Sequence, residues 1–308
     1  MHRFILRRLI MLIPVLLGVI FIMSFLSYVT PGCPAMLRLG EAAPPEDILQ
    51  LRTEWGLEYP FLMQFVNRVV GVVTLDFGES YQSRRPVFSE IIDRFPSTMR
   101  LAFMGISLGL IIGIPLGILS ATKQYTIFDF GATVAGLLLV SIPNFWLGLM
   151  MIILFSVTLG WLPPMGFAEP IQWIMPTLTI GTGSAAMIMR MTRSSMLEAI
   201  RQDYIRTARA KGQKERIVIF RHALRNALIP VTTSAGLSFG FLLGGAVLTE
   251  TIFSIPGLGA FLVSGIFQRD WPIVIGGVIL ISITFTIVNL LVDILYAFID
   301  PRIRSQYR

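Results

Sequence analysis

The residue types that most often carry chemistry are sparse in this chain and lie far apart. The lysines are Lys123, Lys211 and Lys214, and none follows a glycine, so the Gly-x-x-x-x-Gly-Lys-Ser/Thr loop that cradles nucleotide phosphates is absent. The two histidines, His2 and His222, are too distant for a His-Glu-x-x-His zinc site. The sequence therefore predicts no catalytic site, no metal site and no cofactor in this chain.

Charged residues instead gather in one segment, 190–228, where ten basic residues face only three acidic ones. Apolar or small residues recur there at helical spacing, at Leu197, Ile200, Tyr204 and Ala208. Gly212 is typical of a helix end, and a second short helix is expected from about 214 to 225. The segment is therefore the first candidate for a functional surface.

The composition places these residues in a membrane protein. Of the 308 residues, 54% are hydrophobic and 14% are charged, with a mean hydropathy of +0.74 and a net charge of +7. These values exclude a soluble or disordered chain, and the single cysteine, Cys33, excludes a disulfide framework.

Six stretches are long and apolar enough to cross a bilayer as helices. They are 9–29, 100–121, 133–158, 173–190, 229–250 and 272–296. The first follows three arginines, as a signal peptide does, but it is too long for one and no small-residue cleavage site follows it. We expect a retained helix and an all-α polytopic fold with six transmembrane helices.

Arginine and lysine in the short connections predict the orientation. The N-terminus, the connection 190–228 and the C-terminal tail each carry several basic residues and the connection 122–132 carries Lys123, whereas 159–172 has no basic residue and 251–271 has only Arg269. Both termini are therefore expected in the cytoplasm. Segment 190–228 also resembles a helix-turn-helix, but two membrane helices hold its ends and leave little freedom to enter a DNA groove, so we expect no nucleic-acid partner. A connection that is basic only because of the topology remains an alternative.

The predicted domains follow from this topology. Residues 1–30 form the N-terminal tail and first helix, 31–98 an extracytoplasmic segment, 99–298 the core with the cytoplasmic loop 191–228, and 299–308 a cytoplasmic tail. The segment 31–98 has helical apolar spacing through Leu51 and Trp55 and again through Phe61 and Phe65. A helical cap and a solvated loop are both open.

Small residues at spacing of four occur within two predicted helices. They are Gly105, Gly109, Gly113 and Gly117 in the second, and Gly236, Gly240 and Gly244 in the fifth. Such faces let helices approach closely in lipid, and they could also slide during a transport cycle. Pro143 and Pro230 are expected to kink or to begin helices. The predicted spans lack ionisable residues at mid-depth, which disfavours an ion-coupled carrier.

Several motifs in chain order resemble those of permeases in ABC importers of the dipeptide, oligopeptide and nickel group. The stretches are Asp203-Tyr-Ile-Arg-Thr-Ala-Arg-Ala-Lys-Gly212 and Arg221-His-Ala-Leu-Arg-Asn-Ala-Leu-Ile-Pro230, with Pro31-Gly32-x-Pro34, Asp76-Phe77-Gly78, Trp161-Leu162-Pro163, Pro256-Gly257-Leu258-Gly259 and Asp300-Pro301-Arg302. The importer motif Glu-Ala-Ala-x-x-x-Gly keeps only Ala208 and Gly212 here, so no glutamate role is carried over.

The resemblance implies a type I ABC importer permease in a bacterial or archaeal inner membrane. Its partners would be a second permease, two cytoplasmic ATPase subunits and an extracytoplasmic binding protein. The ATPase-coupling residues would be Tyr204, Arg206, Thr207, Ala208, Arg209 and Gly212. A small residue at Ala208 and the chain reversal at Gly212 would allow close docking.

The resemblance makes di- or oligopeptides the expected substrate, with a nickel or metal chelate or glutathione as alternatives. Polar residues in the spans are candidates for the path, namely Ser141, Asn144, Thr182, Ser184, Ser238 and Asn289, although interhelical hydrogen bonds explain them equally well. Two other classes stay open: an ion-coupled carrier or channel, and a membrane anchor that transports nothing.

Overall fold

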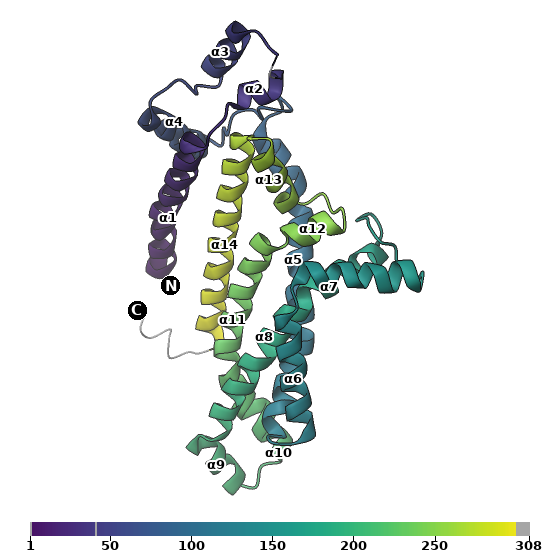
Figure 1. The fold of residues 1–308 in the computed structure, drawn as a ribbon. Helices are drawn as coiled ribbons and strands as arrows, with labels where there is room; N and C mark the ends of the chain where they lie inside the picture. Colours follow the sequence, from purple (N-terminus) through teal and green to yellow (C-terminus); the bar gives the residue numbers. More distant parts are fainter. Residues whose placement is uncertain (1, 41, 300–308) are drawn as a thin grey trace. The chain divides into compact units, whose positions relative to one another are not determined.

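A computed structural model describes residues 2–40 and 42–299, and their regular structure is helical apart from one isolated β-bridge between Glu79 and Pro86 (Figure 1). The helices are α1 (His2–Val29), α2 (Pro34–Leu39), α3 (Pro45–Glu54), α4 (Phe61–Thr74), α5 (Val87–Thr122), α6 (Ile127–Ser141), α7 (Asn144–Met151), η1 (Ile152–Thr158), η2 (Pro170–Trp173), α8 (Ile174–Ile200), α9 (Asp203–Ala210), α10 (Glu215–Ile217), η3 (Val218–Ala223), α11 (Leu224–Gly245), α12 (Val247–Ile252), α13 (Leu258–Phe267) and α14 (Trp271–Ile299). The predicted all-α class is confirmed for these residues. The predicted tail 299–308 lies outside them except for its first residue.

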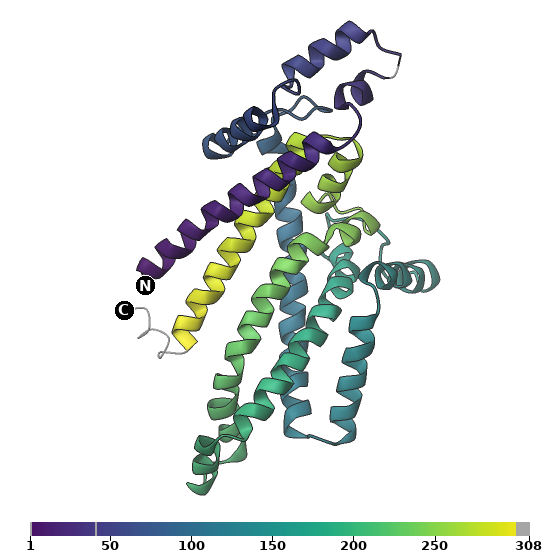
Figure 2. The same ribbon diagram turned by 60° about the vertical axis from the view of Figure 1, so that its left-hand side comes forward.

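The chain forms two compact units. One contains Thr98–Ile255 with the described part of Ile287–Arg308, and the other contains His2–Ser97 with Pro256–Thr286. In the first unit α8 packs against α11, α6 and α7, and Figure 2 shows α11 and α6 on opposite sides of it. Helix α8 is therefore the central element of that unit.

Glycines bring α5 and α8 into close contact. A Cβ atom on Gly113 would lie 2.7 Å from the carbonyl oxygen of Ala185, and one on Gly117 would lie 2.8 Å from that of Met189. Because both neighbours are backbone atoms, neither can move aside cheaply. The packing interpretation of this glycine run is confirmed. In the other run, Gly236 meets Val292 of α14, but Gly244 has no atom of the described chain near its missing side chain.

The third predicted stretch, 133–158, is bent at Pro143, which was expected to kink or to begin a helix. It is two helical segments, Ile127–Ser141 and Asn144–Thr158, which meet at an angle of 97°. The break is at Ile142 and Pro143, both in extended conformation, and Pro143 is the N-cap of α7. Proline disfavours helical geometry in the residue before it, so Pro143 both ends α6 and allows α7 to begin in a new direction.

The fifth predicted stretch, 229–250, belongs to a helix that begins earlier than predicted. Helical structure is continuous from Glu215 to Gly245, through the π-helical turn η3, so Pro230 lies inside α11 rather than at its start. The separate short helix expected at 214–225 is the first part of this longer helix. Val218, Ile219 and Ala223 are buried, which gives the helix a packed face before its apolar stretch begins.

By length and composition, four described helices can cross a membrane: Ile10–Val29, Val87–Thr122, Glu215–Gly244 and Trp271–Val292. The bent pair α6 and α7 makes a fifth if it counts as one span. Helix α8, the predicted fourth stretch, is not among these. Many of its side chains are buried against neighbouring helices, including Thr179, Ser184 and Thr192. A helix enclosed by protein does not need an apolar surface toward lipid, so its mean hydropathy can be lower than that of a lipid-facing helix. The chain is a multi-pass membrane protein.

A buried ion pair joins α5, α6 and α8 near the start of α6. The guanidinium of Arg193 donates from Nε and Nη2 to the two carboxylate oxygens of Asp129, at 2.7 and 2.9 Å. Ser120 also donates to Asp129, as does the backbone N–H of Tyr125. The Asp129 side chain is 6% exposed, so this carboxylate depends on these four donors for the hydrogen bonds that water would supply.

In the second unit, the helical alternative for segment 31–98 is confirmed, since α2, α3 and α4 all lie there. Helix α4 packs on α1 through aromatic rings, with Phe61 and Phe65 in edge contact with Phe21. A buried cluster joins Ile20 of α1, Tyr81, and Trp271 and Ile275 of α14. Cys33, free and half-buried, is the N-cap residue of α2.

Gly117→Leu is expected to destabilise the purified chain by about 1–3 kcal/mol, because the new side chain would enter the α5–α8 contact. Thermal unfolding in detergent measures the effect. Gly131→Leu is the control, since Gly131 lies in α6 with no atom of the described chain within 4 Å of its missing Cβ. Equal melting temperatures for the two variants would contradict the close packing of α5 and α8.

Asp129→Asn is expected to lower stability by about 1–3 kcal/mol, because it leaves the Arg193 guanidinium without its anion. The same unfolding assay applies. Replacing both partners, as in Asp129→Leu with Arg193→Met, should recover part of the loss because no unpaired charge remains. If the double variant loses as much stability as Asp129→Leu and Arg193→Met lose separately and added together, the result would argue against a direct pair.

Candidate functional site

The basic segment singled out in the sequence folds as a short helix, α9, between the ends of α8 and the α10–η3 helix. Helix α8 ends at Ile200, Arg201 and Gln202 form a turn, and α9 begins at Asp203. The buried side chains of α9 are Ile205 and Ala208. They belong to one cluster with residues of α5, α8, η3 and α11, namely Ile118, Ala121, Met196, Ala199, Val218, Ile219, Ala223 and Ala227. Helix α9 is thus anchored to the core of its unit.

Ala208 packs inside the chain. It is only 9% exposed and contacts the chain's own cluster, so its small size serves internal packing, and its part in coupling stays a prediction. The helical spacing read from the sequence did not include Ile205, which is fully buried. The predicted face joined Ile200, Tyr204 and Ala208 as if one helix were continuous. The break at Arg201 and Gln202 resets the helical phase and turns Ile205 inward instead of Tyr204.

Gly212 ends α9 in the way that its residue type indicates. Its φ is +72°, in the left-handed region that glycine adopts readily. The N–H of Gly212 donates to the carbonyl of Arg209 at 2.9 Å, and the N–H of Gln213 donates to that of Ala208 at 3.3 Å. These two bonds define a Schellman motif with glycine at the position after the C-cap. The predicted helix end at Gly212 is confirmed.

Polar contacts hold the outer side of α9 in place. Arg209 donates two hydrogen bonds to the carboxylate of Glu215, at 2.6 and 3.1 Å, across the Gly212 turn. The amide of Asn226 donates to the Tyr204 hydroxyl at 2.8 Å. Hydrogen bonding to Glu215 raises the pKa of Arg209. The turn and the helix therefore behave as one rigid element.

The remaining predicted coupling residues lie on the outer face of α9 or just beyond it. Tyr204 is 41% exposed, the Arg206 side chain is 78% exposed, and Thr207, Arg209 and Gly212 are also exposed. Further exposed basic residues continue this surface, namely Arg201, Lys211, Lys214, Arg216, Arg221 and Arg225. We call Tyr204, Arg206, Thr207, Arg209 and Gly212 the α9 surface. Its exposed side chains give α9 a positively charged outer face.

The predicted path residues lie in several helices and make mostly local contacts. Ser141, Thr182 and Ser184 donate their hydroxyls to carbonyls of their own helices, so interhelical hydrogen bonds do not explain them. Ser184 packs against Gly109 of α5, within a helix contact. Asn144, exposed at the start of α7, lies beside Gly183 of α8. Ser238 and Asn289 are half-buried in α11 and α14. A path role for these residues stays a prediction.

The described residues also contain no group of three or more His, Cys, Asp or Glu side chains that could hold a metal ion. The exposed basic side chains on and around α9 remain the candidate functional surface of the first unit.

Comparison with known proteins agrees with this description. Residues 113–305 match a family model described as binding-protein-dependent transport system inner membrane component, and residues 1–102 match the N-terminal model of such components. The dipeptide transport system permease protein DppB of Alkalihalophilus pseudofirmus is 41% identical, over 97% of this chain and 98% of its own. The glutathione transport system permease protein GsiC of Salmonella choleraesuis is also 41% identical, over 99% of both chains.

A solved structure supports the fold alone. An inward-facing form of the MetNI methionine ABC transporter contains a chain that superposes with a TM-score of 0.57 at 21% identity, covering 68% of this chain and 96% of that one. Together with the match over residues 113–305 and the full-length relatives, this fold confirms the resemblance to importer permeases. The chain belongs to the family of binding-protein-dependent transport system inner membrane components, and it is a membrane permease subunit rather than an enzyme.

Proposed function

We propose that this chain is one of two permease subunits of an ATP-driven importer that moves di- or oligopeptides across a bacterial or archaeal inner membrane. The relatives named as dipeptide and peptide permeases support the substrate class. Two cytoplasmic ATPase subunits and an extracytoplasmic binding protein would complete the assembly. No cofactor is assigned to this chain, and ATP would be bound and hydrolysed by its partners.

In this proposal the chain crosses the membrane six times with both termini in the cytoplasm. The bent α6–α7 pair and the protein-enclosed α8 would supply the two crossings that hydropathy alone does not count. The segment 31–98 would then be extracytoplasmic, 191–228 cytoplasmic, and 299–308 a cytoplasmic tail, with 1–30 and 99–298 as the first helix and the core. The charge distribution supports this, because the α9 surface is basic and cytoplasmic connections are enriched in arginine and lysine.

The coupling role is supported by one observation: α9 has an exposed, positively charged face and an opposite face that is buried in the core. Ile205 and Ala208 anchor α9 to α8 and to the helix that continues into α11, while the α9 surface stays free. A force applied to that surface by an ATPase would therefore pass to two long helices of the core. Rocking of these helices against the second permease would alternate access to the path, with Ser141, Asn144, Thr182, Ser184, Ser238 and Asn289 as candidates for its lining.

Glutathione is the second candidate substrate, because a relative at the same 41% identity is named as a glutathione permease. Glutathione is a tripeptide with a γ-glutamyl linkage, so the two candidates share an ammonium group, a carboxylate and amide bonds but differ in their first linkage. A ligand screen on the binding protein of this transporter separates them. Selective binding of glutathione over di- and oligopeptides would favour glutathione as the substrate. Binding of a nickel chelate instead would rule out both of these candidates.

Gly212→Asp is expected to abolish most ATP-dependent dipeptide uptake in proteoliposomes while membrane insertion is retained. The aspartate places a negative charge on the basic docking turn. Gly212→Asn is the matched control, since asparagine has nearly the same shape and tolerates the left-handed conformation without adding charge. We expect the control to keep most uptake. Normal uptake by Gly212→Asp would refute the coupling assignment.

Arg206→Glu is expected to reduce copurification of the ATPase subunits by about tenfold, because an exposed interfacial charge is reversed while Ile205 and Ala208 keep α9 folded. Lys123→Glu, which reverses an exposed charge in the α5–α6 connection, should leave copurification unchanged. Quantitative blotting of the purified complex measures both. Uptake that continues without any bound ATPase would instead indicate an ion-coupled carrier.

A further inference from the structure

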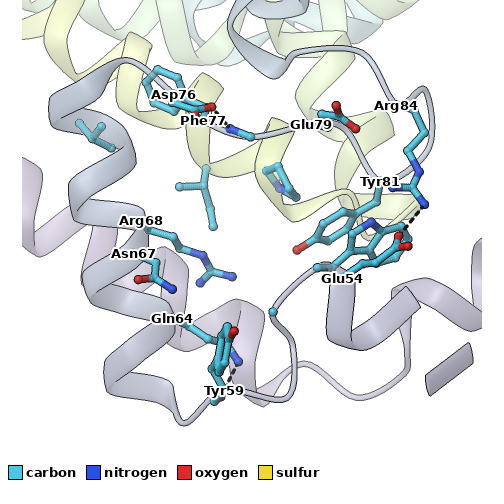
Figure 3. A pocket seen from close by; sticks show the side chains of 16 residues that line it. Glu54, Tyr59, Gln64, Asn67, Arg68, Asp76, Phe77, Glu79, Tyr81 and Arg84 are labelled. Carbon is cyan, nitrogen blue, oxygen red and sulfur yellow. Dashed lines mark hydrogen bonds and ion pairs between the residues drawn. The ribbon is translucent and has the colours of Figure 1, made fainter. Parts of the chain in front are cut away.

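The second unit contains a cavity of about 430 Å³ that the coupling role does not use. Figure 3 shows its walls: the end of α3 with Glu54, the α4 side chains Gln64, Asn67 and Arg68, and the loop that carries Glu79 and Tyr81. A cavity of this volume falls within the range of small-molecule sites. All of its lining residues belong to the unit formed by His2–Ser97 and Pro256–Thr286.

The depth of the cavity holds an arginine with spare hydrogen-bonding capacity. Arg68 donates from Nη2 to the hydroxyl of Ser27 at 3.0 Å, and its Nη1 is buried with no hydrogen-bond partner among the residues that the structure describes. Within the same described residues, Arg68 belongs to no ion pair. Burial lowers the pKa of Arg68, yet an arginine keeps its charge at neutral pH. Arg68 as a whole is half-buried beside Tyr81, and a guanidinium with an unused donor atom favours a carboxylate or phosphate ligand.

The opposite wall supplies an aromatic pair and a second donor. The ring of Tyr81 stacks on Trp55 with their centroids 4.1 Å apart, and Figure 3 shows its hydroxyl directed across the cavity toward Arg68. Burial raises the pKa of Tyr81 to about 12, against the opposing effect of Arg68. The phenol is therefore neutral at pH 7 and can donate a hydrogen bond to an anion held by Arg68. Both rings line the cavity, where Tyr81 is 6% exposed and the Arg84 guanidinium lies over Trp55, 5.4 Å from its ring centroid.

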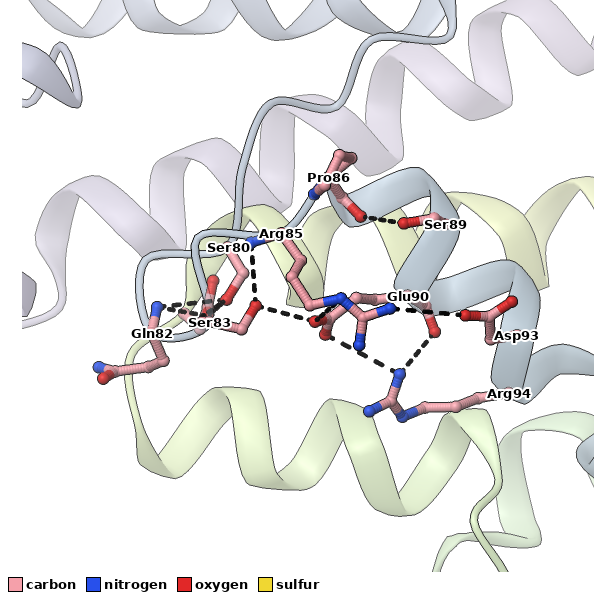
Figure 4. A network of polar contacts seen from close by, with 10 residues as sticks. Ser80, Gln82, Ser83, Arg85, Pro86, Ser89, Glu90, Asp93 and Arg94 are labelled. Carbon is pink, nitrogen blue, oxygen red and sulfur yellow. Dashed lines mark hydrogen bonds and ion pairs between the residues drawn. The ribbon is translucent and has the colours of Figure 1, made fainter.

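This wall is held rigidly from behind. The carboxylate of Asp270, only 1% exposed, accepts hydrogen bonds from the hydroxyl of Ser80 at 2.6 Å and from the N–H of Tyr81 at 3.1 Å. Figure 4 shows the network that continues along the loop, where Ser83 donates to the buried carboxylate of Glu90 at 2.8 Å. Such a network fixes Tyr81 before any ligand enters, which lowers the entropic cost of binding.

The rim of the cavity has the opposite charge to its depth. Asp76 and Glu79 are exposed lining residues, whereas the other acidic one, Glu54, is paired with Arg84 at 3.3 Å. The charged lining residues include three acids and two arginines, so a plain anion gains little from the site as a whole. A ligand with an inner carboxylate and an outer ammonium matches both regions. The polar rim also disfavours the acyl chains of a lipid.

We propose that this cavity is a binding site for a small zwitterion, a free amino acid or short peptide, whose carboxylate pairs with Arg68 and whose ammonium faces Glu79 and Asp76. The Trp55–Tyr81 pair takes up the apolar part of the ligand. The site belongs to this unit alone, so it does not depend on the transport proposal.

Calorimetry on the purified chain in maltoside detergent tests the assignment with alanyl-alanine as the probe. The dipeptide should bind, and its C-terminal amide should bind at least about tenfold more weakly because it lacks the anion for Arg68. The N-acetylated dipeptide should bind more weakly as well, because it has no ammonium for the acidic rim. Failure of alanyl-alanine to bind, or equal affinity of the dipeptide and its amide, would overturn the proposal.

Arg68→Gln should reduce dipeptide affinity by at least about tenfold and should make the dipeptide and its amide bind alike. Arg52→Gln is the control, since Arg52 is an exposed arginine of the same unit that pairs with Glu58 outside the cavity. Unchanged affinity in Arg68→Gln would refute the site. The comparison of ligands on the unmodified chain stays decisive even where this variant unfolds.

Two competitors distinguish other sources of the same chemistry. Inorganic phosphate that displaces the dipeptide at equal concentration would reveal a plain anion site and overturn the zwitterion assignment. Mixed micelles of phosphatidylethanolamine and the maltoside that displace it would reveal a lipid-headgroup site and overturn it equally. Because no ATPase or uptake is involved, failure here leaves the coupling role of α9 standing, and failure of coupling leaves this site standing.

Discussion

The close contact between α5 and α8 is the constraint on which the first unit depends. Four glycines on α5 remove the side chains that would separate the two backbones, and the contact is close enough that a single added carbon meets a carbonyl oxygen. In lipid, where association of helices gains little from hydrophobicity, such packing is a main source of stability. With α5 on one face, α6 and α7 on another and α11 on a third, α8 is enclosed, so it carries threonine, serine and glycine where a lipid-facing helix would carry leucine.

That arrangement also determines how α9 is held. The end of α8 and the start of the helix that leads into α11 present buried side chains to Ile205 and Ala208, so a helix of 8 residues that would not be stable alone becomes a fixed part of the core. The Schellman turn at Gly212 and the Arg209–Glu215 pair then return the chain to the core without a flexible loop. Rigidity at this point is what a coupling element needs, because a flexible connection would absorb the motion it receives.

The second unit uses polar interactions for a similar purpose. The buried carboxylates of Asp270 and Glu90 accept hydrogen bonds from the loop around Ser80–Ser83, and they position the aromatic pair of the Arg68 cavity. Arg68 differs from these carboxylates because it is half-buried and its Nη1 has no hydrogen-bond partner in the described chain. A ligand carboxylate would supply that partner.

The sequence was enough to predict an all-α membrane protein, because long apolar stretches belong in lipid and basic residues mark the short cytoplasmic connections, whatever the details of packing. It also identified the Gly212 helix end and the glycine contact of α5, since both follow from the local properties of glycine, and it marked Pro143 as a place for a kink. The size of that bend, 97°, and the inward orientation of Ile205 and Ala208 required the folded structure. A two-residue break changes the phase of a helix without a strong sequence signal. The Arg68 cavity was equally hidden, because its walls come from residues far apart in the chain that only folding brings together.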